Sequence, residues 1–178
     1  AAGLRDLAAD DVCVVSFEIA EAAVGAAVRI AAERGARLVV NPSPVRPLSK
    51  ELLAAEPIVI VNAGEIGELT GEDDVAAGVV ALQARGCSAV IATLGGDGAH
   101  VATRDWDLAV PAFPASPVDT TGAGDTFTGV VAAAVAAGAG VVQAVRRGAA
   151  AAALSTEAVG ARTGMPAGAD IDALLDEH

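Results

Sequence analysis

The sequence is poor in aromatic residues. Its 178 residues include no tyrosine, one tryptophan and three phenylalanines, which excludes a core built on aromatic rings. Forty-four alanines, with many valines, leucines and isoleucines, bring the hydrophobic share to 53%. This composition predicts a closely packed aliphatic core and excludes an intrinsically disordered chain. The length suits one full domain and is short for two.

Positive charge is also scarce. Eleven Lys and Arg residues stand against 23 Asp and Glu residues, so the formal net charge is −12, and Lys50 is the single lysine. Such an excess of acid repels polyphosphates and anionic lipid surfaces. Nucleic acid and membranes are therefore not expected as partners.

Cysteines and long apolar runs are few. Cys13 and Cys87 both lie in apolar segments, which predicts buried, reduced thiols rather than a disulfide or a metal pair. One uncharged stretch of 20 residues separates Asp125 from Arg146, but it is largely alanine and glycine. It predicts two buried helices rather than a membrane span. No signal-peptide pattern heads the sequence, so a soluble, cytoplasmic protein is expected.

Apolar runs of strand length alternate with helical patterns along the chain. Strands are predicted over residues 12–17, 36–42, 57–62 and 88–95, followed by two antiparallel pieces at 99–103 and 108–113. Helices are predicted over 18–35, 63–71, 72–86 and 169–178, with two Ala-rich helices beginning near Asp125.

This alternation predicts an α/β fold. Fully apolar strands separated by helices indicate a doubly wound, mostly parallel sheet flanked by helices, in one domain over 1–178. Ligands bind such sheets at the carboxyl ends of the strands. Asn41, Asn62, Gly95 and Asp119 all lie where an apolar segment gives way to a loop.

The segment DTTGAGDTFTG (119–129) carries the strongest chemical signal. Gly122, Ala123 and Gly124 precede a long uncharged helix, and small residues there leave backbone N–H groups free to bind an anion. Asp125 is open to two interpretations. It could simply cap the helix. Alternatively, a carboxylate beside an anion-binding loop suits removal of a proton from a hydroxyl during phosphoryl transfer.

Five segments together resemble the ribokinase-like (PfkB) family of carbohydrate kinases. DTTGAGDTFTG is similar to the family's second signature, VNAGEIGELTG (61–71) to its N-x-x-E segment, and TLGGDG (93–98) to its nucleotide loop. NPSP (41–44) and VGARTGMP (159–166) resemble segments of ribokinases in particular. The five follow one another in the family's order and spacing.

The resemblance implies a phosphotransferase that moves a phosphoryl group from MgATP to a sugar hydroxyl, with ribose as the favoured sugar. Asp125 would be the catalytic base, and the N–H groups of residues 122–124 would form an anion hole. Asn62 and Glu65 would organise phosphate and Mg²⁺, Glu65 through a water molecule. Glu18 falls where ribokinases place a sugar-binding glutamate.

The resemblance also implies a nucleotide site and a site for K⁺ or a similar monovalent cation. The nucleotide would contact Asn62, Thr93, Leu94, Gly95, Gly96, Asp97, Gly98, Gly124 and Ala149. The cation would be held by Asp119, Thr121, Ser155, Ala158, Gly160 and Gly164. Two of these positions depart from the family pattern. Gly164 stands where ribokinases often have a serine, and Ala149 stands where they often have a polar residue or histidine.

The family's chains are longer than this one, and the resemblance covers their catalytic and nucleotide-binding portion without the N-terminal strands and lid. The expected partners are ATP or ADP, a small sugar, and either a second copy of the chain or the missing N-terminal segment. An unpaired sheet edge would otherwise favour aggregation.

Alternatives remain open at the level of function and of single residues. The chain could be a non-catalytic nucleotide- or anion-binding remnant, or a kinase of fructose, ketodeoxygluconate or a nucleoside such as adenosine. Asn62 and Glu65 could form a capping box, and 93–98 could be a hairpin turn. Glu18 could be only an acidic residue in the first turn of a helix.

Overall fold

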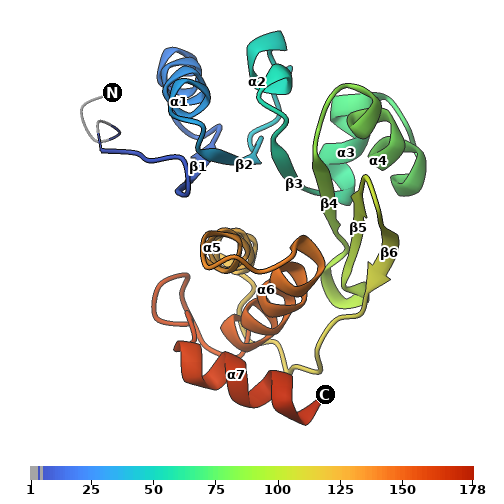
Figure 1. Cartoon of the computed structure of the whole chain (residues 1–178). Helices are drawn as coiled ribbons and strands as arrows, with labels where there is room; N and C mark the ends of the chain where they lie inside the picture. The colour runs from blue at the N-terminus through green and yellow to red at the C-terminus, as the bar shows by residue number, and fades with distance from the viewer. Residues whose placement is uncertain (1–3, 5) are drawn as a thin grey trace. The chain divides into compact units, whose positions relative to one another are not determined.

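The computed structural model describes residue 4 and residues 6–178, and the chain divides into two compact units. The first unit comprises the chain up to Leu94 together with His100–Leu108, and the second comprises Gly95–Ala99 and Ala109–His178 (Figure 1). Within the described residues, no helix is both long and apolar enough to cross a membrane.

Most of a six-stranded sheet lies in the first unit, in the order β1-β2-β3-β4-β5-β6. The first four strands are parallel: β1 (Val12–Ser16), β2 (Arg37–Asn41), β3 (Ile58–Asn62) and β4 (Ala89–Thr93). The connections to β5 (Ala99–Thr103) and β6 (Asp107–Val110) are too short for parallel crossovers, so this end of the sheet is antiparallel. The structure confirms a mostly parallel α/β sheet flanked by helices.

Four helices of the first unit cover one face of the parallel strands. They are α1 (Glu21–Arg34), α2 (Lys50–Ala54), α3 (Ala63–Thr70) and α4 (Val75–Ala84). Alternate strand residues pack against them in two clusters, one with α1 and α2 and one with α3 and α4. All four helices lie on one face because the parallel strands are neighbours in chain order. Right-handed crossovers between successive neighbours put every connecting helix on the same face.

On β2, β3 and β4 the residues that point to the opposite face are buried as well, whereas Val14 of β1 is exposed. Val39, Ile58, Ile60, Ala89 and Ile91 each expose 6% of their surface or less. Continuous apolar runs therefore predicted the strands correctly, since parallel strands are buried on both faces.

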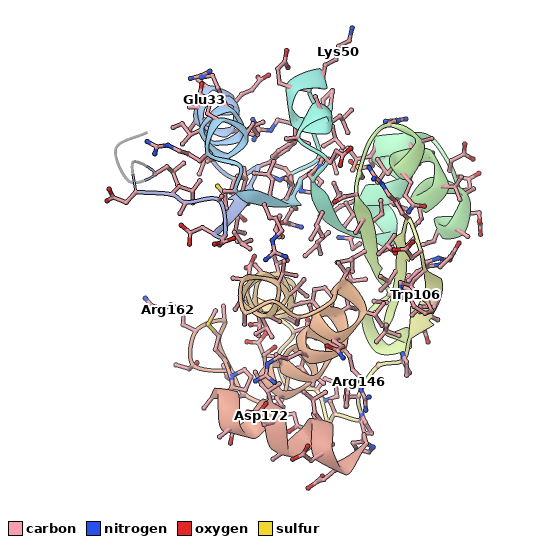
Figure 2. The ribbon with its side chains drawn as sticks, viewed as in Figure 1. Glu33, Lys50, Trp106, Arg146, Arg162 and Asp172 are labelled. Atoms are coloured by element: carbon pink, nitrogen blue, oxygen red, sulfur yellow. The ribbon has the colours of Figure 1, made fainter. Side chains whose placement is uncertain are left out.

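Two elements differ from the sequence prediction in the first unit. The first helix begins at Glu21 rather than at residue 18. Glu18 lies in a turn before the helix, and its backbone N–H donates to Ser16 Oγ. The short helix α2 was not predicted from the Pro-rich segment before it. Ser49 caps α2 by accepting from the N–H of Leu52, which is buried (3.1 Å). Its single lysine, Lys50, projects away from the unit (Figure 2).

The second unit is helical, as predicted for its Ala-rich sequence. It contains α5 (Ala123–Ala136), α6 (Val141–Ser155) and α7 (Gly168–Glu177). Gly148 lets α5 and α6 approach closely, because a Cβ there would lie 2.7 Å from Val131 Cγ2. Ile171 of α7 packs on Ala150 and Ala151 of α6. In place of aromatic rings, small side chains that let the helices lie close together fill the core of this unit.

The two cysteines are buried and free, as predicted. Burial raises the pKa of the Cys13 thiol, and it raises the pKa of Cys87 to about 11. Both thiols are therefore protonated at neutral pH.

Candidate active site

Polar side chains end the four parallel strands of the first unit and form a row at its carboxyl edge. The pairing register sets Ser16 beside Asn41 and Asn62 beside Thr93. The Asn41 amide donates to the carbonyl of Ile60 (3.0 Å), and the Thr93 hydroxyl donates to that of Val61 (3.3 Å). These bonds tie the strand ends together at the edge where such sheets bind ligands.

Asn62 and Glu65 form a capping box at the start of α3. The Glu65 N–H donates to Asn62 Oδ1 and the Asn62 N–H donates to Glu65 Oε2, both at 2.9 Å. The capping interpretation is thereby confirmed. The box uses neither Glu65 Oε1 nor the Asn62 side-chain NH₂, and Asn62 is exposed. It therefore fixes the orientation of two polar groups while leaving one atom of each outside the box.

The start of α5 is formed by glycine rather than by Asp125. Gly122 is the N-cap, with a left-handed φ of 78°, and no side chain caps the helix. Asp125 is the third residue of the first turn and is exposed. The interpretation of Asp125 as the helix cap is therefore wrong, and the helix begins two residues earlier than predicted.

Two glycines at this helix start meet different surroundings. A Cβ on Gly122 would lie 2.6 Å from Ala161 Cβ, whereas a Cβ on Gly124 would meet nothing within 4 Å. The backbone at Gly124 is thus open to an approaching group. N–H groups in a first helical turn lack helix acceptors and lie at the positive end of the dipole. The Ala123 N–H already donates to Thr120 O at 3.2 Å, so one of the three predicted anion-hole groups has a partner.

Three backbone carbonyls converge beside Gly164 in the loop after α6. From the point where a Cβ would stand on Gly164, the oxygens of Ser155, Gly160 and Ala158 lie at 2.6, 3.1 and 3.4 Å. A side chain on Gly164 would therefore collide with the carbonyl oxygen of Ser155. Converging carbonyl oxygens are suitable ligands for a hard cation such as K⁺.

Asp119 stands at the edge of the same loop. Its carboxylate accepts from the N–H of Thr121 (2.9 Å) and from the N–H of Gly160 (2.8 Å). Hydrogen bonds from Thr121, and then from Gly160, hold the pKa of Asp119 below its usual value. The Asp119 carboxylate therefore stays ionised, and it is hydrogen-bonded to Gly160, one of the three residues whose carbonyls converge. Three predicted cation residues (Ser155, Ala158 and Gly160) thus surround Gly164, and Asp119 links Gly160 to Thr121.

The predicted nucleotide loop is a tight turn. Gly95–Asp97 forms one turn of 3₁₀ helix, closed by a bond from Gly98 N to Gly95 O (3.1 Å). Gly98 has a φ of 91°, and a Cβ there would clash with the carbonyl of Val110. The turn interpretation is confirmed, and a turn leaves its backbone available to a ligand. Thr93 and Leu94 belong to the first unit, and Gly95 to Gly98 belong to the second.

The remaining two predicted site residues are Glu18, between β1 and α1, and Ala149, in α6. Glu18 is exposed and precedes α1, whose first-turn acidic residue is Glu21, so Glu18 does not serve as a first-turn acid. Ala149 is a buried residue of α6. Sequence analysis did not single out Arg46, which donates to the backbone around Glu18. Its position two residues after the NPSP segment was the available signal.

The described residues contain no cluster of three or more His, Cys, Asp or Glu side chains that could hold a metal ion. His100, the histidine of β5, instead pairs with Asp107 across the hairpin (2.7 Å). Figure 2 shows Trp106 at the turn of that hairpin.

The fold and these motifs are typical of one known protein family. Residues 4–168 match the model of the pfkB family carbohydrate kinases, and the chain belongs to that family.

Among its relatives, the chain is 40% identical over 127 residues to the bifunctional ribokinase/ribose-5-phosphate isomerase A of Fructilactobacillus sanfranciscensis, a match covering 68% of this chain and 24% of that protein. It is 31% identical over 165 residues to the ribokinase of Bacillus subtilis, covering 93% of this chain and 55% of the relative. The structure resembles that of Arabidopsis thaliana ribokinase complexed with ribose and ATP, with a TM-score of 0.85 and 27% identity. This match covers 92% of the present chain and 55% of the Arabidopsis chain. The chain thus spans about half the length of the ribokinases it matches, and a quarter of the bifunctional protein.

Proposed function

We propose that the chain carries the catalytic and nucleotide-binding residues of an ATP-dependent sugar kinase, with ribose as the favoured acceptor. The observation that carries the proposal is the start of α5. An exposed carboxylate, Asp125, stands in the first turn of a helix whose cap is glycine and whose Gly124 backbone is open. This arrangement combines a base with a site for the negative charge of a phosphoryl group.

In the proposed reaction, Asp125 accepts the proton of a sugar hydroxyl while the hydroxyl oxygen attacks the γ-phosphorus of ATP. A new bond forms between that oxygen and phosphorus, the bond to the bridging oxygen of ADP breaks, and ADP leaves with the electron pair. Free N–H groups of the first turn of α5, Gly124 among them, would stabilise the charge on the transferring group.

The first unit contributes residues for the nucleotide and its metal. Mg²⁺ bound to ATP supplies charge neutralisation during phosphoryl transfer. Glu65 Oε1 would accept a hydrogen bond from metal-bound water, and the Asn62 NH₂ would donate to a phosphate oxygen. The capping box supports these roles, because it orients both side chains before any ligand arrives.

We further propose that K⁺ binds the carbonyls of Ser155, Ala158 and Gly160, with Asp119 balancing its charge. The bound cation would order the loop that carries Ala161, against which Gly122 packs. It would thereby fix the start of α5. Replacing K⁺ by choline at constant ionic strength should lower turnover, and an unchanged rate would contradict the assignment.

Ribose is favoured by the NPSP and VGARTGMP segments and by the names of the relatives. The test is ADP release by the purified chain with MgATP and KCl, using ribose, fructose, ketodeoxygluconate and adenosine as acceptors. ADP release that requires ribose supports the proposal, and faster release with another acceptor would replace ribose by that compound.

A second candidate function is nucleotide or anion binding without transfer. It is favoured by the open backbone at Gly124, which supports anion binding whether or not transfer follows. Saturable ATP binding without ADP release for any acceptor would support this candidate. A second copy or a further segment as a partner also stays a prediction, which a mass measurement in solution would test.

A further inference from the structure

We infer that Arg46 is a positioning residue that holds the turn carrying Glu18 in place for sugar binding. The inference rests on the proposed role of Glu18. The turn comprises residues 17–20, between β1 and α1.

Arg46 contacts the backbone on both sides of Glu18. Its Nη2 donates to the carbonyl of Phe17 and to the carbonyl of Ile19, the latter at 3.0 Å. Its guanidinium also lies 4.9 Å from the centre of the Phe17 ring. One rigid, planar group thus fixes the turn at three points, through two charge-assisted hydrogen bonds and a cation–π contact.

The segment just before Arg46 holds the same turn through its backbone. Phe17 N donates to Asn41 O (3.2 Å), and Ser16 Oγ donates to Ser43 O (3.4 Å) while it accepts from Glu18 N (3.2 Å). Residues 41–46 therefore act together as a support for Glu18. Within this support, Arg46 provides the charged side chain.

Core packing holds only one end of this turn. Phe17 exposes 5% of its surface and packs in the core, whereas Glu18, Ile19 and Ala20 are exposed. Phe17 and Arg46 also line a groove of about 590 Å³, whose other walls come mainly from α1 and α2. The hydrogen bonds of Arg46 therefore hold the exposed part of the turn, which core packing does not reach.

Arg46 is a poor choice for stability alone. Its Nε is buried and has no hydrogen-bond partner among the described residues. A buried N–H without a partner is unfavourable, and an apolar side chain of similar length would fill the same space without that penalty. The two carbonyl contacts are what the guanidinium adds.

The experiment compares Arg46→Met with Arg46→Lys and with a control, Arg29→Met, on an exposed arginine of α1. Loss of two charge-assisted bonds at the sugar-binding turn should raise the KM for ribose about tenfold or more in Arg46→Met, with the KM for ATP unchanged. Arg46→Lys should lie between the wild type and Arg46→Met, and Arg29→Met should match the wild type. Equal increases in both KM values would overturn the inference.

A double-mutant cycle separates positioning from a general structural effect. If Arg46 acts through Glu18, Arg46→Met should add little to the rise in KM already caused by Glu18→Gln. Fully additive effects would show that Arg46 acts by another route.

Hydrogen exchange keeps the test independent of the proposed function. Amides of residues 17–20 should exchange about tenfold faster in Arg46→Met than in the wild type or Arg29→Met, because the turn opens more easily. Unchanged exchange would overturn the inference even in an active enzyme. Absence of turnover in the wild type would instead count against the proposed function, and exchange would still decide whether Arg46 holds the turn.

Discussion

Gly122 and Gly124 flank Ala123, but the structure gives them different tasks. Gly122 adopts a left-handed backbone and packs against Ala161. Gly124 faces open space, where a side chain would obstruct a ligand rather than the fold. At the scale of single residues, one glycine thus serves the fold and the other serves the proposed anion site.

This difference predicts opposite effects for two substitutions. Gly122→Ala should lower the free energy of unfolding by about 1–3 kcal/mol, because of the strained φ and the close contact with Ala161. Gly124→Val should leave the melting temperature nearly unchanged and weaken ATP binding. Thermal unfolding and calorimetric titration with MgATP check both. Unaltered ATP affinity in Gly124→Val would remove Gly124 from the anion site.

The buried thiol of Cys87 predicts how stability changes at high pH. Burial raises its pKa to about 11, from the value of 9.0 for an exposed thiol. The unfolded chain therefore releases this proton first, so the stabilising effect is complete below pH 9 and is lost as pH rises towards 11. The expected loss is up to about 2–3 kcal/mol.

Denaturant unfolding at several pH values between 8 and 11 measures this loss. Cys87→Ala is the matched control, and it should flatten the dependence on pH while lowering stability at pH 8 by removing a buried side chain. An identical slope in wild type and variant would contradict the assignment.

At the scale of elements, the capping box at α3 combines a structural and a proposed catalytic task. Asn62 and Glu65 satisfy backbone N–H groups at the helix start, and their remaining polar atoms are not used by the box. The sequence predicted each task separately, and the structure shows that the first does not exclude the second.

Two variants can separate the tasks. Glu65→Gln should keep the cap, since glutamine also completes a capping box, but it should reduce turnover and weaken its dependence on Mg²⁺ because the charge is lost. Asn62→Ala should lower the free energy of unfolding by about 1 kcal/mol. Melting temperatures and rates at several Mg²⁺ concentrations distinguish them. Wild-type turnover in Glu65→Gln would leave Glu65 with the structural task alone.

Helix starts were the elements that sequence patterns located least well. Neither α1 nor α5 has a side-chain cap, since Ala20 and Gly122 occupy the N-cap positions. Acidic residues nearby, Glu18 and Asp125, were therefore natural candidates for the helix start. Glu18 instead precedes α1 and Asp125 is the third residue of α5, because both helices begin without the side-chain cap that a local pattern would reveal.

At the scale of the whole molecule, the sheet could be predicted because its strands are short and apolar and, from β2 to β4, buried on both faces. The resemblance of five motifs to the kinase family indicated the Asn62–Glu65 pair and the cation residues, and it agreed with the choice of Asp125 from its helix start. The convergence of three carbonyls at Gly164 and the contacts of Arg46 depend on backbone directions in loops, which spacing does not encode. No linker composition marked the division into two compact units, because the boundaries fall directly after β4 and within β5 and β6.

The central claim is that Asp125 accepts the proton of the sugar hydroxyl, and the Asp125→Asn variant tests it most directly. This change keeps the size of the side chain at an exposed position of α5 and removes its basicity. With ribose and MgATP, we expect kcat to fall by about 10²–10⁴-fold while the Kd for MgATP changes little. A parallel loss of ATP affinity, or turnover close to that of the wild type, would contradict the role of Asp125 as the catalytic base.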